Sequence, residues 1–358
     1  MQKDEETMAM ADILVDAARQ QASDIYLIGG LPLTYKVYGR QVRVNPDVRL
    51  MPDHLKTMIG DLYALARRPN KLEQGCFEDD FSFGNAVARY RINTFYQRGS
   101  RSAVIRIVAF GIPDPVQYHI PASIMELADL AKGFVLLTGA TGSGKSTTLA
   151  CLIDAINAKY QKTIITMEDP IEFIHRHNRS IVIQREINTD TDSYLSALRS
   201  SFRESPDVLL VGEMRDSETI ATAMTAAETG KLIFSSLHTV SAADTIDRVL
   251  DGFVADQQAQ ARMQLSRVLK CVVCQQLVPT VDGKLYPAFE IMDVNPAIRN
   301  LIREGKTYQI NAIIQENRAN GMCTMNDSLE TLFRQGVITK ETALNHSEDV
   351  GALAKRLG

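Results

Sequence analysis

Residues 139–146 read Gly-Ala-Thr-Gly-Ser-Gly-Lys-Ser and form a complete G-x-x-x-x-G-K-[ST] phosphate loop. An apolar run at residues 133–138 precedes the loop and predicts a buried strand, and the apolar spacing of residues 145–157 predicts a helix after it. In such a loop the glycines let backbone N–H groups face phosphates, and the helix N-terminus adds partial positive charge. The sequence therefore predicts a site for a nucleoside triphosphate.

Each loop residue has an expected place in that site. Lys145 would contact the β- and γ-phosphates, and Ser146 would ligate Mg²⁺. The expected cofactors are therefore ATP and Mg²⁺. The other residues expected to bind the nucleotide are Gly139, Thr141, Gly142, Ser143, Gly144 and Thr147.

The bulk composition restricts the class of protein. The chain has 358 residues and a formal net charge of −4, so it is long enough for two domains and has no overall attraction for nucleic acid. No apolar stretch approaches the roughly 20 residues that cross a bilayer, and the acidic N-terminus is unlike a signal peptide. These features predict a protein of the cytoplasm that does not bind nucleic acid.

The five cysteines are scattered and odd in number, which is typical of a reducing compartment. Cys271 and Cys274 have the spacing of half a zinc site, but no second Cys or His pair follows at zinc spacing. Because their neighbours are apolar, we expect both to be buried structural residues.

The pattern along the chain predicts an α/β protein with four regions. Residues 1–110 read as a small α+β domain that opens with a helix from about Met8 to Gln21. A linker with three prolines follows at 111–122, and a helical region occupies 296–358. Between them, in 123–295, apolar strands alternate with helices, which indicates a mostly parallel sheet with its ligand at the carboxyl ends of the strands. The expected strands are 133–138, 163–167, 181–184, 207–211 and 232–236.

Two acidic side chains follow apolar runs of this region. Glu213 follows the run at 206–212 as in a Walker B strand, and Glu168 follows the run at 164–167. We expect Glu168 to be the general base and Glu213 to act on Mg²⁺ through water, although the pattern alone leaves their division of roles open. Asp169 and Glu172 either cap the turn at Pro170 or join the site.

A histidine and a set of arginines complete the candidates. His238 ends the apolar run at 232–237, where a side chain that senses the γ-phosphate would lie. The stretch 89–106 is rich in arginine and also contains aromatic residues. It could supply arginine fingers to a neighbouring subunit, form a nucleic-acid surface, or be a solvated strand face.

Taken together, these motifs resemble the secretion and type IV pilus ATPase superfamily, and most closely its pilus retraction branch, the PilT family. Four boxes match in order and extend the resemblance over most of the chain: Walker A at 139–147, the Asp box at 166–173, Walker B at 211–216 and the His box at 227–239. Residues 297–304 match the Ala-Ile-Arg-Asn-Leu-Ile-Arg-Glu motif of that branch.

The resemblance implies a Mg²⁺-dependent ATPase in which a PAS-like N-terminal domain joins a RecA-like ATPase domain. It implies a homo-hexameric ring that drives pilus retraction and twitching motility at the inner face of the cytoplasmic membrane, at the pilus base. The implied partners are an inner-membrane platform protein and other pilus ATPases. Three arginines, Arg91, Arg98 and Arg106, match positions that the family brings to the nucleotide.

Other interpretations remain: a motor for type II or type IV secretion, or a switch that binds ATP with little turnover. The presence of both Glu168 and Glu213 argues against the switch. The chain also departs from the family pattern, because Lys231 replaces the first histidine of the His box and Tyr26 replaces another usual histidine.

Within the motif at 297–304, helical spacing separates two kinds of side chain. Ile298, Leu301 and Ile302 share one face, while Arg299 and Arg303 share another. We therefore expect a helix that packs by its apolar side and presents both arginines outward.

Overall fold

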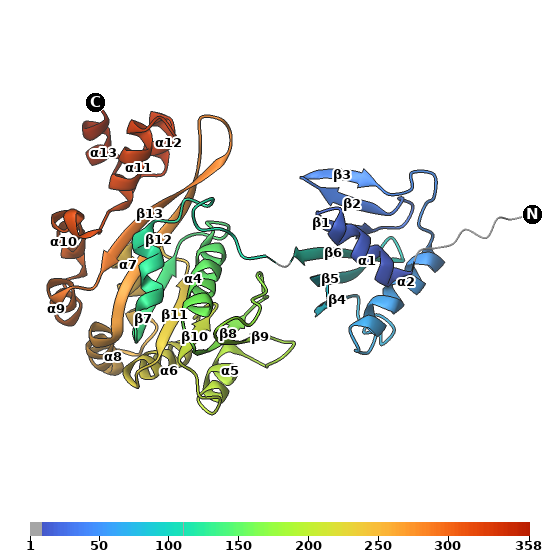
Figure 1. The fold of residues 1–358 in the computed structure, drawn as a ribbon, viewed down its shortest axis with the longest axis horizontal. Helices are drawn as coiled ribbons and strands as arrows, with labels where there is room; N and C mark the ends of the chain where they lie inside the picture. Colours follow the sequence, from blue (N-terminus) through green and yellow to red (C-terminus); the bar gives the residue numbers. More distant parts are fainter. Residues whose placement is uncertain (1–8, 110) are drawn as a thin grey trace, which may run out of the picture. The chain divides into compact units, whose positions relative to one another are not determined.

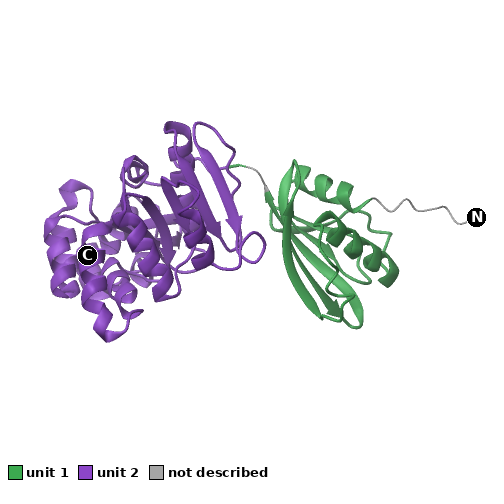
Figure 2. Ribbon diagram, turned by 90° about the horizontal axis from the view of Figure 1, so that it is seen from below, with its two compact units in different colours: residues 1–111 green, residues 112–358 purple. Residues whose placement is uncertain are grey.

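The computed structural model describes residues 9–109 and 111–358, and the chain divides into two compact units, 1–111 and 112–358 (Figures 1 and 2). The α/β fold class that the sequence predicts, with a separate α+β N-terminal unit, is confirmed. Helices 296–358 belong to the second unit, together with the parallel sheet.

The described residues of the first unit form a six-stranded antiparallel sheet in the order β3-β2-β1-β6-β5-β4 and two helices. Helix α1 (Met10–Arg19) buries Met10, Ile13, Leu14 and Ala17, which is the spacing of one helical face. The sequence predicted this helix from about Met8 to Gln21. Met8 lies outside the described residues, and the helix ends at Arg19, two residues before Gln21. The other elements are α2 (Pro52–Leu65), β1 (Ala22–Leu27), β2 (Thr34–Val37), β3 (Arg40–Arg43), β4 (Glu78–Gly84), β5 (Ala88–Gln97) and β6 (Ser100–Ala109).

The second unit contains a seven-stranded sheet in the order β13-β12-β7-β11-β10-β8-β9 (Figure 1). All neighbouring strands are parallel except the β12–β13 pair, which is antiparallel. The strands are β7 (Gly133–Thr138), β8 (Thr163–Glu168), β9 (Ile181–Glu186), β10 (Val208–Val211), β11 (Leu232–Leu237), β12 (Leu269–Pro279) and β13 (Leu285–Asp293).

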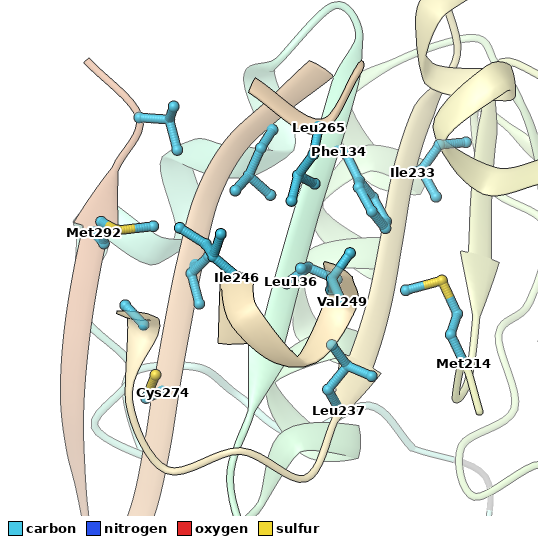
Figure 3. Packing of buried hydrophobic residues seen from close by; sticks show 14 of the residues in the cluster. Phe134, Leu136, Met214, Ile233, Leu237, Ile246, Val249, Leu265, Cys274 and Met292 are labelled. Atoms are coloured by element: carbon cyan, nitrogen blue, oxygen red, sulfur yellow. The ribbon is translucent and has the colours of Figure 1, made fainter. Parts of the chain in front are cut away.

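Helices cover both faces of this sheet, so its central strands are buried on both sides. All six residues of β7 are buried, and alternate residues face two different clusters: Phe134 and Leu136 one, Val135 and Leu137 the other. Figure 3 shows Phe134 and Leu136 near Val249 and Leu265 in the first cluster. The α-helices of this unit before residue 296 are α3 (Ala122–Met125), α4 (Lys145–Lys159), α5 (Tyr194–Ser201), α6 (Ser217–Glu228), α7 (Ala242–Asp251) and α8 (Ala255–Val268).

Two expectations about this sheet were wrong or incomplete. We expected a helix between each pair of strands, but residues 169–180, all of them described, contain none, and β8 and β9 lie side by side. Pro170 follows β8 directly, and the charged stretch 175–179 has no apolar stripe to pack. The sequence pattern also did not predict strands β12 and β13. Cys271 and Cys274 of β12 are buried, as we expected.

The C-terminal region consists of short helices that pack on the first cluster, through residues such as Ile298, Ile310 and Leu353. They are α9 (Pro296–Glu304), α10 (Ile310–Glu316), α11 (Met325–Arg334), α12 (Lys340–Asn345) and α13 (Val350–Leu357). In α9 the apolar face packs as expected, but of its two arginines only Arg303 is exposed. Arg299 is half-buried, and its buried Nε has no hydrogen-bond partner in the described part of the chain, so the expectation that both arginines point outward was wrong.

Candidate functional site

The phosphate loop joins the end of β7 to the start of α4 and packs closely against β12. Gly139 has φ +140, and a Cβ there would lie 2.2 Å from the backbone oxygen of Gln275 on β12. Gly144 has φ +89, and a Cβ there would lie 2.8 Å from the side-chain nitrogen of the same Gln275. Both positions therefore require glycine for backbone conformation and for space.

The loop holds the chemical groups that a polyphosphate needs. Lys145 is buried, and its Nζ donates to the carbonyls of Gly139 at 2.7 Å and Ala140 at 2.9 Å. Burial lowers the pKa of Lys145, while the charges of Glu213 and Glu172 oppose that shift. The buried Oγ of Ser143 has no hydrogen-bond partner in the described part of the chain. Such orphaned polar atoms are expected where a polar ligand binds.

A cavity of about 310 Å³ lies beside the loop, within the size range of small-molecule sites. Thr141, Gly142, Lys145 and Ser146 line it from the loop side. It is also lined by residues that lie at or after the carboxyl ends of β8, β10 and β11: Glu168, Asp169, Glu172, Glu213 and His238. Thr147 is half-buried in α4 and does not line the cavity.

Glu213 and His238 contact each other directly. His238 Nε2 lies 3.2 Å from Glu213 Oε1, and Arg215 donates to Glu213 Oε2 at 2.8 Å. Partial burial raises the pKa of Glu213, but the hydrogen bond and charge of Arg215 outweigh it, so the pKa is lowered overall. Glu213 is therefore held as a carboxylate, the form that can order water around a cation.

Glu168, at the end of β8, has a different environment. Thr166 Oγ1 donates to its Oε1 at 2.6 Å, and Gln184 Nε2 donates to the same oxygen at 3.2 Å. Burial raises the pKa of Glu168 despite these two hydrogen bonds. A carboxyl group with a raised pKa is a stronger base once it is ionised, which suits proton removal from water.

Several residues around the cavity escaped the sequence analysis. Gln275 of β12 packs on the loop and accepts a hydrogen bond from Thr148 Oγ1 at 2.8 Å. His175 and Tyr194 line the cavity, and Gln184 donates a hydrogen bond to Glu168. No local signal distinguishes these residues, whereas Arg215 lies inside the Walker B box and could have been considered.

The three arginines that we expected to contact the nucleotide, all in the first unit, do not form one cluster. Arg91 on β5 and Arg106 on β6 are paired directly in register, and both line a hollow with Asp24, which lies 3.5 Å from Arg106. Arg98 instead occupies the β5–β6 turn with Gly99, and both residues have positive φ. At about 3.3 Å per strand residue, Arg98 lies roughly 20 Å along the hairpin from Arg91.

Comparisons with known proteins give one consistent family. The model of the "Type II/IV secretion system protein" family matches residues 4–304. The chain is 42% identical over 338 residues to the type IV pilus retraction ATPase PilT of Pseudomonas aeruginosa, covering 94% of this chain and 97% of that protein. It is 43% identical to a twitching motility protein of Neisseria gonorrhoeae, covering 86% and 84% of the two chains.

Comparison with solved structures indicates the same family. A crystal structure of the pilus retraction motor PilT with bound ADP superposes with a TM-score of 0.87 at 42% identity, over 97% of this chain and 99% of that one. The chain therefore belongs to the type II/IV secretion system protein family and, within it, to the PilT family of type IV pilus retraction ATPases.

Proposed function

We propose that this chain is an ATP-hydrolysing motor that drives type IV pilus retraction and twitching motility. The observation that carries the proposal is the cavity in which the phosphate loop meets Glu168, Glu213 and His238. Relatives of nearly the same length are named for pilus retraction and twitching motility, and a solved relative binds ADP.

The residues of the cavity divide the reaction between them. Glu168 takes a proton from the attacking water as the water oxygen bonds to the γ-phosphorus, the bond between the γ-phosphorus and its bridging oxygen breaks, and ADP and phosphate leave. Lys145 neutralises charge on the β- and γ-phosphates, and loop N–H groups hold the remaining oxygens. His238, in contact with Glu213, senses whether the γ-phosphate is present.

The residues at the cavity also fit Mg²⁺. Ser146 is exposed at the start of α4 and lines the cavity together with the Glu213 carboxylate. Hydroxyl and carboxylate oxygens suit Mg²⁺, which keeps several waters and takes phosphate oxygens when a nucleotide binds. Ser146 would hold the ion directly and Glu213 through water; the bound ion would neutralise charge on the phosphates.

The proposed working unit is a homo-hexamer. Arg91, Arg98 and Arg106 would reach the nucleotide of a neighbouring subunit, because P-loop enzymes commonly receive arginine fingers in trans. Among the described residues, no helix combines the length and apolar character needed to cross a bilayer. We place the ring at the cytoplasmic face of the inner membrane, at the pilus base, against a platform protein and other pilus ATPases.

The test combines turnover with motility. Purified protein should release phosphate from ATP in a Mg²⁺-dependent manner, and Lys145→Ala should reduce the rate at least a hundredfold, about 3 kcal/mol, with an unchanged circular dichroism spectrum. In cells that lack their own retraction ATPase, the wild-type chain should restore twitching, whereas the Lys145 variant should not.

The outcomes separate the alternatives. ATP binding without phosphate release would indicate the low-turnover switch. Phosphate release without twitching, but with rescue of a secretion-defective strain, would indicate a type II or type IV secretion motor. Either result would overturn the proposal of a retraction motor.

A further inference from the structure

Gln184 connects the candidate base to the segment that follows it. It lies on β9 directly beside Thr166 of β8, and its Nε2 donates to Glu168 Oε1 at 3.2 Å and to the Phe173 carbonyl at 2.8 Å. Its Oε1 accepts a hydrogen bond from the backbone N–H of His175 at 2.8 Å. One side-chain amide therefore joins β9, the carboxylate of Glu168 and the backbone of residues 173–175.

The orientation of this amide is determined by its partners. If it were rotated by half a turn, its carbonyl oxygen would face two acceptors, and its NH₂ group would face the N–H of His175. All three hydrogen bonds would then be lost. Gln184 is consequently held in a single orientation, with an N–H directed at Glu168.

The two oxygens of Glu168 are not equivalent. Oε1 accepts from both Thr166 and Gln184, while the described residues place no hydrogen-bond donor on Oε2. With Oε1 held on both sides, the carboxylate cannot rotate freely. Oε2 is the oxygen left to accept a proton from water in the cavity.

We infer that Gln184 is a positioning residue for ATP hydrolysis, which together with Thr166 fixes Glu168 so that Oε2 faces the attacking water. The inference rests on the proposed function, because it takes Glu168 as the base. Hydrogen bonds to a carboxylate also favour its charged form, so Gln184 keeps Glu168 ionised at lower pH than burial alone would allow.

The test replaces the amide by an apolar group of similar length. Gln184→Met should lower kcat about tenfold with little change in KM for ATP, and it should move the acid limb of the kcat profile to higher pH. Thr166→Val removes only a hydrogen bond to Glu168. It should likewise lower kcat and move the acid limb of the kcat profile to higher pH. The other titratable groups near Glu168, namely His175, Glu172 and Tyr194, are unchanged in both variants.

A matched control is Gln276→Met, since Gln276 is a half-buried strand glutamine bonded to His346 away from the cavity. Its kcat and pH profile should equal those of the wild type. A merely structural role would lower the stability or raise KM of Gln184→Met without moving the acid limb, and this result would overturn the inference. Full hydrolysis by Glu168→Gln would instead overturn the assignment of the base.

Discussion

Glu168 is placed where the folded protein disfavours its charge. Burial raises the pKa of its carboxyl above the unfolded value, so between the two values the folded state binds more protons and stability falls as pH rises. We predict that Glu168→Gln raises the free energy of unfolding at pH 7.5 and that the gain disappears near pH 4, where both side chains are neutral. Urea unfolding at the two pH values checks this; a variant less stable than the wild type at pH 7.5 would contradict it.

The close contact of Gly139 with β12 gives a second prediction at the scale of one residue. Gly139→Ala should destabilise the nucleotide-free protein by about 3 kcal/mol or more, because its Cβ would overlap the Gln275 carbonyl 2.2 Å away. Gly142→Ala is the matched control. Gly142 has φ +81, but a Cβ there would have no atom of a non-neighbouring residue within 4 Å. Its variant should therefore lose only about 1–2 kcal/mol of unfolding free energy. Equal thermal stability of the two variants would show that the loop does not depend on contact with β12.

At the scale of elements, one buried carboxylate joins two helices. Glu290 of β13 is fully buried, and it accepts from the N–H of Ala242 at 2.7 Å and of Met325 at 3.2 Å. These are the first residues of α7 and α11. Burial raises the pKa of Glu290, and the hydrogen bonds from these two N–H groups oppose that shift. Through these bonds Glu290 connects the helix that follows His238 to the C-terminal helices.

Glu290→Gln should therefore cost about 2–3 kcal/mol of unfolding free energy, because the new NH₂ group would face a backbone N–H in place of an acceptor. Glu304→Gln, at the exposed end of α9, should change it by less than about 0.5 kcal/mol. Denaturant midpoints measure both variants. If the midpoints of the two variants coincided, Glu290 would not be joining the helices energetically.

At the scale of the whole molecule, the proposed ring predicts complementation between inactive chains. Arg91→Ala retains its phosphate loop, and Lys145→Ala retains its arginines, so a mixed ring would contain some complete sites if the arginines act in trans. Each variant alone should have little ATPase activity, and the mixture should recover a measurable fraction of the wild-type rate. A mixture no more active than its components, or full activity from monomeric wild-type protein, would exclude a shared site.

The features of this protein that depend on residues close together in the chain could be predicted without a structure. The run at 133–138 and the helix from Lys145 were predicted at their observed starts, because the phosphate loop between them is a local motif with one strand-to-helix geometry. The placement of Glu168, Glu213 and His238 around one cavity also followed, since each lies within two residues of the carboxyl end of a strand and parallel strands end at the same edge.

The residues that lie beside that edge could not be predicted in the same way, because they come from distant parts of the chain. Gln184 and Gln275 are ordinary polar strand residues in the sequence, and they matter because strand order brings β9 next to β8 and β12 next to β7. Glu290 likewise matters because the fold brings to it the N-termini of two helices that begin 83 residues apart in the chain. Periodicity reports which face of an element is buried, but it does not say which distant residue will cover that face, because strand pairing is set by packing of the whole sheet.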